Sequence, residues 1–209
     1  MMGAMIRWLL VTGLLALPTG ARAAPMLWHF TGTLAGEDEV RLFALHLPGP
    51  AQVTLRTLSY AGGTDALGTV VPRGGFDPVL ALFDSAGTLL AQDDDGGADV
   101  PADALTGATF DAFLVLALAA GDYTLAVAQF DNLALGPTLA DGFERTGQGA
   151  FTAGFGCPDA QPAFNDVSGV AGCGRSGAFA VEVAALVPEP ASAALLLAPV
   201  LALGVRRHR

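Results

Sequence analysis

The sequence predicts an all-β fold, a jelly-roll-like antiparallel β-sandwich, set between two export segments. Apolar residues in the middle of the chain recur in short runs cut by Gly, Pro, Asn and Asp, and not at helical spacing. The 209 residues include 27 Gly and 13 Pro, which supply many turns. The apolar residues, 52% of the chain, concentrate at the two ends. This leaves residues 24–186 as one domain of ordinary size.

Eight or so short strands fit this central domain, and two packed sheets are the usual way to bury them. We expect a tight hairpin across Asp84-Ser85-Ala86-Gly87, where an Asp opens the turn and a Gly takes the left-handed position. A second hairpin is expected across residues 119–122, and a turn at Pro48-Gly49-Pro50. The expected strands are 28–34, 40–47, 52–60, 79–83, 88–91, 112–118, 123–130 and 178–183.

Residues 1–23 have the three parts of a secretory signal peptide. Arg7 supplies the positive charge, an apolar run of about ten residues follows, and Ala21-Arg22-Ala23 offers small residues at the cleavage site. We expect signal peptidase to cut after Ala23. An uncleaved anchor is the alternative, but the run is shorter than the roughly 20 residues that span a bilayer.

Residues 187–209 form a second export segment. Pro188, Glu189 and Pro190 precede the apolar stretch 191–205, which as a helix would be short for a permanent membrane span. Terminal arginines would keep its end on the cytoplasmic side of the inner membrane. The segment is thus expected to insert transiently as a short transmembrane helix. The basic residues that end it are Arg206, Arg207 and Arg209.

This order of Pro-Glu-Pro, short apolar helix and arginine cluster resembles the PEP-CTERM sorting signal of Gram-negative bacteria. The resemblance implies that an exosortase, a membrane transpeptidase, recognises Pro188-Glu189-Pro190. It also implies that Arg206, Arg207 and Arg209 retain the helix in the membrane before processing. A plain C-terminal tail anchor is the alternative, and it differs in whether the helix is finally removed.

The central domain resembles bacterial pre-peptidase C-terminal domains, which are jelly-roll sandwiches, and small PEP-CTERM proteins of unknown function. The resemblance covers roughly residues 75–183 and implies a fold, not an activity. The segments that carry it are Phe76-Asp77-Pro78, Phe83–Gly87, Asp93-Asp94-Asp95-Gly96, Leu118–Thr124, Gln129-Phe130-Asp131-Asn132 and Ala140–Phe143.

Two cysteines, Cys157 and Cys173, lie in a stretch rich in Gly and Pro. In an exported chain two cysteines most simply form a disulfide. Metal binding would need more Cys or His nearby, and His29 and His46 are far away in sequence.

Calcium is the most specific small ligand that the sequence suggests. Asp93, Asp94, Asp95 and Asp99 lie close together with Asp103, and Ca²⁺ takes six to eight oxygen ligands from such loops. Their spacing is not that of an EF-hand. Two further segments, at 131–132 and 141, would complete a site only if the fold brings them to the same rim. The competing interpretation, which the acidity of the chain favours, is a solvated acidic loop.

Charge and motifs exclude several functions. All ten basic residues are arginine and the formal net charge is −10, so no basic surface for nucleic acid is expected. Residues 24–186 contain two histidines, His29 and His46, and neither Gly-x-Ser-x-Gly nor His-Glu-x-x-His. No catalytic residues are therefore predicted. Sugar binding would need exposed aromatic side chains, for which the candidates are Trp28, Tyr60, Tyr123 and Phe143.

Together these patterns predict an exported, non-catalytic β-sandwich protein of the cell surface or extracellular matrix, sorted by an exosortase. The alternative is a Ca²⁺-stabilised carbohydrate-binding module of the exopolysaccharide layer, with extracellular polysaccharide as its partner. A secreted hydrolase is the third interpretation, because paired carboxylates occur in any acidic chain.

Overall fold

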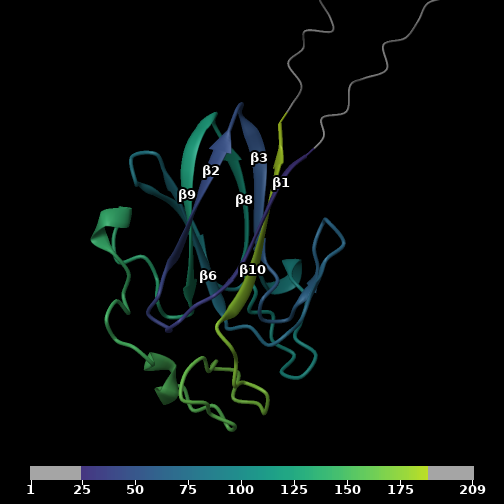
Figure 1. Ribbon diagram of the computed structural model, residues 1–209, viewed down its shortest axis with the longest axis vertical. Coiled ribbons are helices and arrows are strands. Elements are labelled where there is room, and N and C mark those ends of the chain that lie inside the picture. Colours follow the sequence, from purple (N-terminus) through teal and green to yellow (C-terminus); the bar gives the residue numbers. More distant parts are fainter. Residues whose placement is uncertain (1–24, 188–209) are drawn as a thin grey trace, which may run out of the picture. The chain divides into compact units, whose positions relative to one another are not determined.

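The computed structural model describes residues 25–187 and places them in two four-stranded antiparallel sheets (Figure 1). The strand orders are β1-β10-β3-β8 and β2-β9-β6-β7, so the predicted all-β sandwich is confirmed. The bounds of the eight strands are β1 Met26–Thr33, β2 Arg41–Leu47, β3 Ala51–Thr57, β6 Pro78–Asp84, β7 Leu89–Asp93, β8 Phe113–Leu118, β9 Gly121–Gln129 and β10 Ala178–Leu186.

Most connections between these strands cross from one sheet to the other, as in a jelly-roll sandwich. The β6–β7 hairpin stays within one sheet, at the turn the sequence predicts. The Asp84 carboxylate accepts the backbone N–H groups of Ala86 and Thr88, and Gly87 has a φ of 81°. This turn is local chemistry, which explains why the sequence predicts it correctly.

The predicted hairpin across residues 119–122 is wrong. β8 pairs with β3 in the first sheet, whereas β9 pairs with β2 and β6 in the second. A short connection can arch over the end of a sandwich as easily as it can join neighbouring strands. Residues 48–50 do the same, linking β2 and β3 of opposite sheets.

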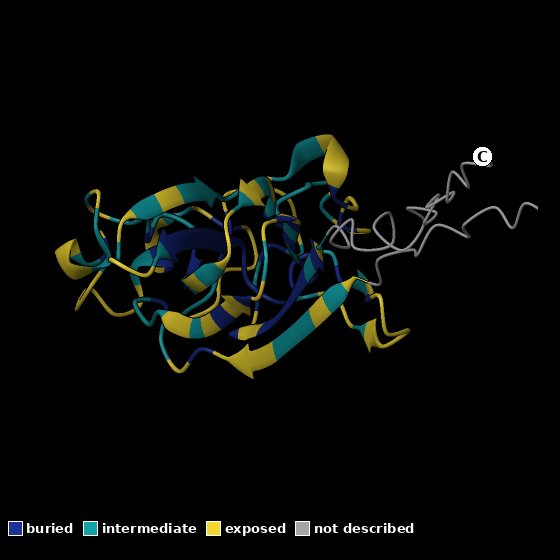
Figure 2. Cartoon of the chain, turned by 90° about the horizontal axis from the view of Figure 1, so that it is seen from above, coloured by how far each residue is buried: buried dark blue, intermediate teal, exposed yellow. Residues whose placement is uncertain are grey.

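The main core lies between the two sheets. β10 contributes Val181 and Val183, β3 contributes Val53 and Leu55, and the facing sheet contributes Leu80, Leu82, Leu125 and Val127, each at most 1% exposed. Alternate residues of β3 are buried, as expected where only one face is covered. Figure 2 shows the buried residues inside the sandwich and the exposed ones on its surface and loops.

β6 is buried on both faces, which explains its unbroken apolar run. Leu80 and Leu82 face the main core, while Ala81 and Phe83 belong to a second cluster on the outer side of the sheet. That cluster is completed by Phe143 from the segment after β9, whose ring meets Phe83 edge to face at 6.4 Å.

Smaller elements occupy the connections. β4 (Gly63–Thr64) and β5 (Val70–Val71) form a short hairpin. The remaining elements are the 3-10 helices η1 Gly97–Asp99, η2 Leu139–Asp141 and η3 Phe151–Gly154. Within residues 25–187 no helix is long and apolar enough to cross a membrane.

Two buried carboxylates organise the chain where strands end. Asp111 accepts hydrogen bonds from the hydroxyl of Thr57 and from the backbone N–H groups of Ser59, Tyr60 and Ala61. These bonds turn the backbone away from the sheet, so β3 ends at Thr57 and not at residue 60 as predicted. Glu37 similarly accepts the N–H groups of Thr152 and Phe164, which ties the segment between β9 and β10 to the sandwich.

A buried arginine joins three of the irregular segments. The Arg175 side chain is 0% exposed and pairs with Asp166 at 2.8 Å and with Asp103 at 3.4 Å. Its guanidinium lies 3.6 Å from the centre of the Tyr60 ring. Asp103 is also held by Arg73 at 2.7 Å. Burial alone would raise the pKa of Asp103, but these partners lower it below its ordinary value.

Replacing Arg175 with Ala should destabilise the protein by about 3–5 kcal/mol, because Asp166 would remain buried without its ion-pair partner, while Asp103 would keep Arg73. Urea denaturation followed by circular dichroism measures this loss. Arg41→Ala is the control: it breaks the surface pair with Glu39 and should cost about 1 kcal/mol or less. Equal losses in the two variants would contradict the role given to the buried arginine.

Candidate functional site

The predicted acidic loop lies at the end of β7. Asp93 is the last residue of that strand, Asp94 and Asp95 follow it, and Asp99 ends the 3-10 helix η1. Asp93 is already engaged: its Oδ2 accepts the backbone N–H of Phe113 at 2.8 Å. Because Phe113 begins β8, this bond ties together the ends of strands from the two sheets.

A fifth aspartate, Asp77, joins this group through strand pairing. It directly precedes β6, and β6 runs antiparallel to β7 with Leu80 opposite Asp93. The residue before β6 therefore lies beside the residues that follow β7. The sequence motif Phe-Asp-Pro places Asp77 at the start of a strand but does not predict this role. Its presence as the one charged residue in the run 76–83 was the available signal.

The Asp77 carboxyl is buried without a partner. The residue is 2% exposed, its Oδ1 atom is enclosed, and no hydrogen bond or ion pair to it occurs among the described residues. Such a group is rare in folded proteins and calls for an explanation, for example a proton or an ion. Gln129, which pairs with Pro78 in β6, is also fully buried with both side-chain polar atoms unpartnered.

Burial and electrostatic repulsion raise the pKa values of several carboxyl groups at this end of the β6–β7 pair. Burial raises the pKa of Asp77 well above its ordinary value, and the charges of Asp95, Asp166 and Asp94 raise it further. Burial, then Asp94 and Asp93, raises the pKa of Asp95 to about 6. The pKa of Asp93 is raised too, chiefly by burial. Three carboxyl groups that resist ionisation therefore lie at one end of the β6–β7 pair.

The other acidic candidates are engaged elsewhere. Asp103 pairs with Arg73 and Arg175, so it is not available to this loop. Asp131 pairs with Arg145, and Asp141 accepts hydrogen bonds from Thr138. Asn132 Oδ1 accepts the N–H of Arg145. Asp99 is exposed. The fold thus leaves Asp94 and Asp95 of the predicted set beside Asp77.

As the side chains stand, their oxygens do not converge as a metal site. Among the described residues, the trio of potential ligands within 4.8 Å of one another is Cys157, Asp159 and Cys173. Both cysteines of that trio are joined in a disulfide, which removes their thiolates. A metal at Asp77 would therefore require the side chains of Asp94 and Asp95 to turn toward it.

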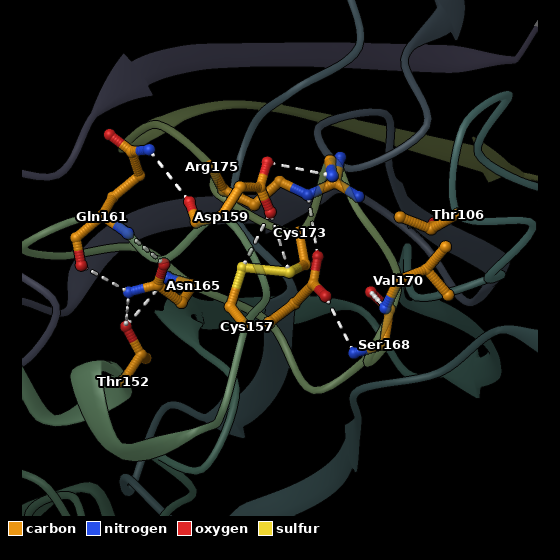
Figure 3. The surroundings of a disulfide bond; sticks show 12 residues. Thr106, Thr152, Cys157, Asp159, Gln161, Asn165, Ser168, Val170, Cys173 and Arg175 are labelled. Carbon is orange, nitrogen blue, oxygen red and sulfur yellow. Dashed lines mark hydrogen bonds and ion pairs between the residues drawn. A yellow bond between two sulfur atoms is a disulfide. The ribbon is translucent and has the colours of Figure 1, made fainter.

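The predicted disulfide is confirmed. Cys157 and Cys173 are bonded, with their Cα atoms 5.7 Å apart (Figure 3). It closes a Gly-rich loop in which Asp159 accepts the backbone N–H of Gly172. On one side Asn165 hydrogen-bonds to Thr152 of η3, as Figure 3 also shows.

The two histidines pair with acidic residues. His46 Nδ1 lies 2.7 Å from Asp122 on the surface, and His29 Nδ1 lies 2.7 Å from buried Asp65. Burial would raise the pKa of Asp65, but the N–H groups of Thr69 and Leu67 and the nearby His29 lower it overall. His29 also lines a small pocket of about 220 Å³ between β1, β10 and the β4–β5 hairpin.

The aromatic candidates for sugar stacking are not exposed. Tyr60 is 0% exposed under Arg175, and Phe143 is 8% exposed against Phe83. Trp28 and Tyr123 are partly buried and pack against the main core. Tyr60 and Phe143 are therefore too buried to stack on a sugar, and Trp28 and Tyr123 are only partly accessible.

The predicted processing sites lie outside the described residues. This applies to Ala21 and Ala23 of the signal peptide and to the membrane segment 191–205. It also applies to the six residues of the sorting signal, Pro188, Glu189, Pro190, Arg206, Arg207 and Arg209.

No protein-family model matches the chain, and no curated protein matches it either. Among solved structures, the pre-peptidase C-terminal domain of a collagenase from Bacillus anthracis is similar. The two are 11% identical over 76% of this chain and 87% of that one, with a TM-score of 0.35.

In buffer stripped of metal ions, we expect the melting midpoint to rise as the pH is lowered from 7 to 5. The raised pKa of Asp95, about 6, means that the folded protein binds a proton in this window. The unfolded chain, with aspartate pKa values of about 3.9, does not, so acid stabilises the folded state. Calorimetry of Asp95→Asn should show a smaller rise, and a midpoint that falls in the native protein would contradict this.

Proposed function

We propose that this chain is an exported, non-catalytic β-sandwich protein of a Gram-negative cell surface or matrix, sorted by an exosortase. The disulfide between Cys157 and Cys173 is the observation that carries the proposal. Disulfides form and persist in oxidising compartments outside the cytosol. The signal-peptide pattern of residues 1–23 assigns the route.

The positions of the predicted processing sites agree with the limits of the folded domain. β1 begins at Met26, three residues after the expected cleavage at Ala23. β10 ends at Leu186, two residues before the Pro-Glu-Pro motif. Removal of both segments would therefore leave every strand of the sandwich intact.

The strand ends nearest the two junctions lie at the same end of the sandwich. β1 and β10 are antiparallel neighbours, and Met26 pairs with Ala185 (Figure 1). An attachment at the C-terminal junction would hold the domain by this end. The acidic loop after β7 and the disulfide loop connect other strand ends, so neither would take part in the attachment. This mode of attachment supports a role as a displayed surface module.

Both histidines and two of the buried acids are held in ion pairs within the fold, which supports a non-catalytic role. His29 and His46 each pair with an aspartate, and the buried acids Asp103 and Asp166 pair with arginines. These contacts stabilise the fold. A general base would need a free group within reach of a substrate.

Mass spectrometry of surface-located protein tests the sorting. We expect an N-terminus at Ala24 and a C-terminus at or near Pro188–Pro190, because these junctions lie outside the folded strands. Replacing Glu189 with Ala should leave the membrane segment attached. Surface protein that still ends in Arg209 would defeat the proposal.

Removing the disulfide should destabilise the exported protein. For a loop with a sequence separation of 16, the Cys157→Ala/Cys173→Ala variant should lose about 3 kcal/mol, through a less constrained unfolded state. Dithiothreitol should lower the melting midpoint of the native protein and leave that of the variant unchanged. Protein isolated from the cell exterior should contain no free thiol, and a titratable thiol pair there would count against export.

A further inference from the structure

We propose that Asp77, Asp94 and Asp95 bind a calcium ion at the end of the β6–β7 pair, with Asp77 as the buried ligand. The inference does not depend on the proposed sorting. It differs from the site that the sequence suggests, because it adds Asp77 and excludes Asp93, Asp99 and Asp103. It rests on the buried, unpartnered carboxyl of Asp77 beside two acidic residues of the loop after β7.

Strand geometry brings the three residues together. In the β6–β7 ladder, Leu80 lies opposite Asp93, and neighbouring strands are about 4.8 Å apart. β7 ends at Asp93, so Asp94 and Asp95 begin the loop at the end of the pair where β6 starts. Asp77 directly precedes that strand. The carboxylates therefore come from two adjacent backbones, as a shared ion requires.

The state of each side chain fits a ligand. The Asp77 carboxyl makes no hydrogen bond or ion pair with a described residue, although the residue is only 2% exposed. Asp94 and Asp95 are likewise free of hydrogen bonds and ion pairs among residues 25–187 and lie at or near the surface. Their side chains can rotate toward Asp77 at little cost, and backbone carbonyls and waters can complete the shell of six to eight oxygens that Ca²⁺ takes.

The local charge also requires compensation. The strongest charge effects on Asp77 come from four acids, Asp95, Asp166, Asp94 and Asp111. Of these, Asp166 is neutralised by Arg175 and Asp111 by hydrogen bonds. Among residues 25–187, no ion pair or hydrogen bond of this kind is made by Asp77, Asp94 or Asp95. A divalent cation would compensate their charges.

The chemistry of the ligand atoms indicates which metal ion the site would prefer. All three side chains offer carboxylate oxygens, and no histidine or free thiol lies in this group, which favours a hard cation over zinc or copper. Asp94 and Asp95 lie in a loop outside the strands, and Asp95 is exposed, which suits the flexible coordination of Ca²⁺ better than the strict octahedron of Mg²⁺. Extracellular calcium modules of this kind bind with dissociation constants of roughly 10⁻⁴–10⁻³ M.

Thermal melting of the full chain at pH 7, after removal of metal ions, tests the site. At 5 mM CaCl₂ we expect the midpoint of the native protein to rise by roughly 5 °C. Asp77→Asn should abolish this rise and, because it removes a buried carboxyl, should melt no lower than the native protein without calcium. Asp99→Asn is the matched control: it removes the same charge from the same loop and should keep the calcium response.

Isothermal titration with CaCl₂ provides a second measurement. We expect one ion per chain for the native protein and for Asp99→Asn, and at least a tenfold loss of affinity for Asp77→Asn. A melting rise that NaCl of equal ionic strength reproduces would show charge screening and would overturn the proposal. So would an equal calcium response in the native protein and in Asp77→Asn, or no response in the native protein.

Discussion

The buried guanidinium of Arg175 is the interaction on which the irregular half of this molecule depends. It contacts Tyr60 from the connection after β3, Asp103 from the connection before β8, and Asp166 from the disulfide loop. These connections are rich in glycine, whose ordering costs more backbone entropy than that of other residues, so contacts that fix several of them at once are needed. One fully enclosed charge with two acidic partners and an aromatic face holds all three against the sandwich.

The same end of the sandwich shows how the fold distributes its acidic residues. Asp103 and Asp166 face arginines, while Asp111 and Glu37 accept backbone N–H groups. These carboxylates act as internal connectors that replace regular secondary structure. Asp77 has neither kind of partner. The contrast between satisfied and unsatisfied buried acids, and not the number of acids, distinguishes a candidate ion site from an ordinary acidic loop.

Local chemistry explains which parts of the fold the sequence predicts. The turn at 84–87 follows from one Asp and one Gly, and most strands follow from alternation and turn residues. Local chemistry does not predict which strands pair. Residues 119–122, for example, suit an arch between the two sheets as well as a hairpin within one sheet. Cys157 and Cys173 are predictable as the two cysteines of the chain. The roles of Asp77 and Arg175 cannot be predicted from the sequence, since they depend on neighbours that the tertiary fold supplies.

The place of β10 in the first sheet has a consequence for the order of folding. This strand is the last of the domain, yet it lies between β1 and β3 and pairs with both. The first strand therefore has no neighbour until the final residues have left the ribosome. Closing this sheet joins residues as far apart in sequence as Met26 and Ala185, and such long-range pairing is slow. A polypeptide that cannot complete its sheet early stays unfolded for longer. Passage through a narrow translocation channel, as in the proposed export, requires an unfolded chain.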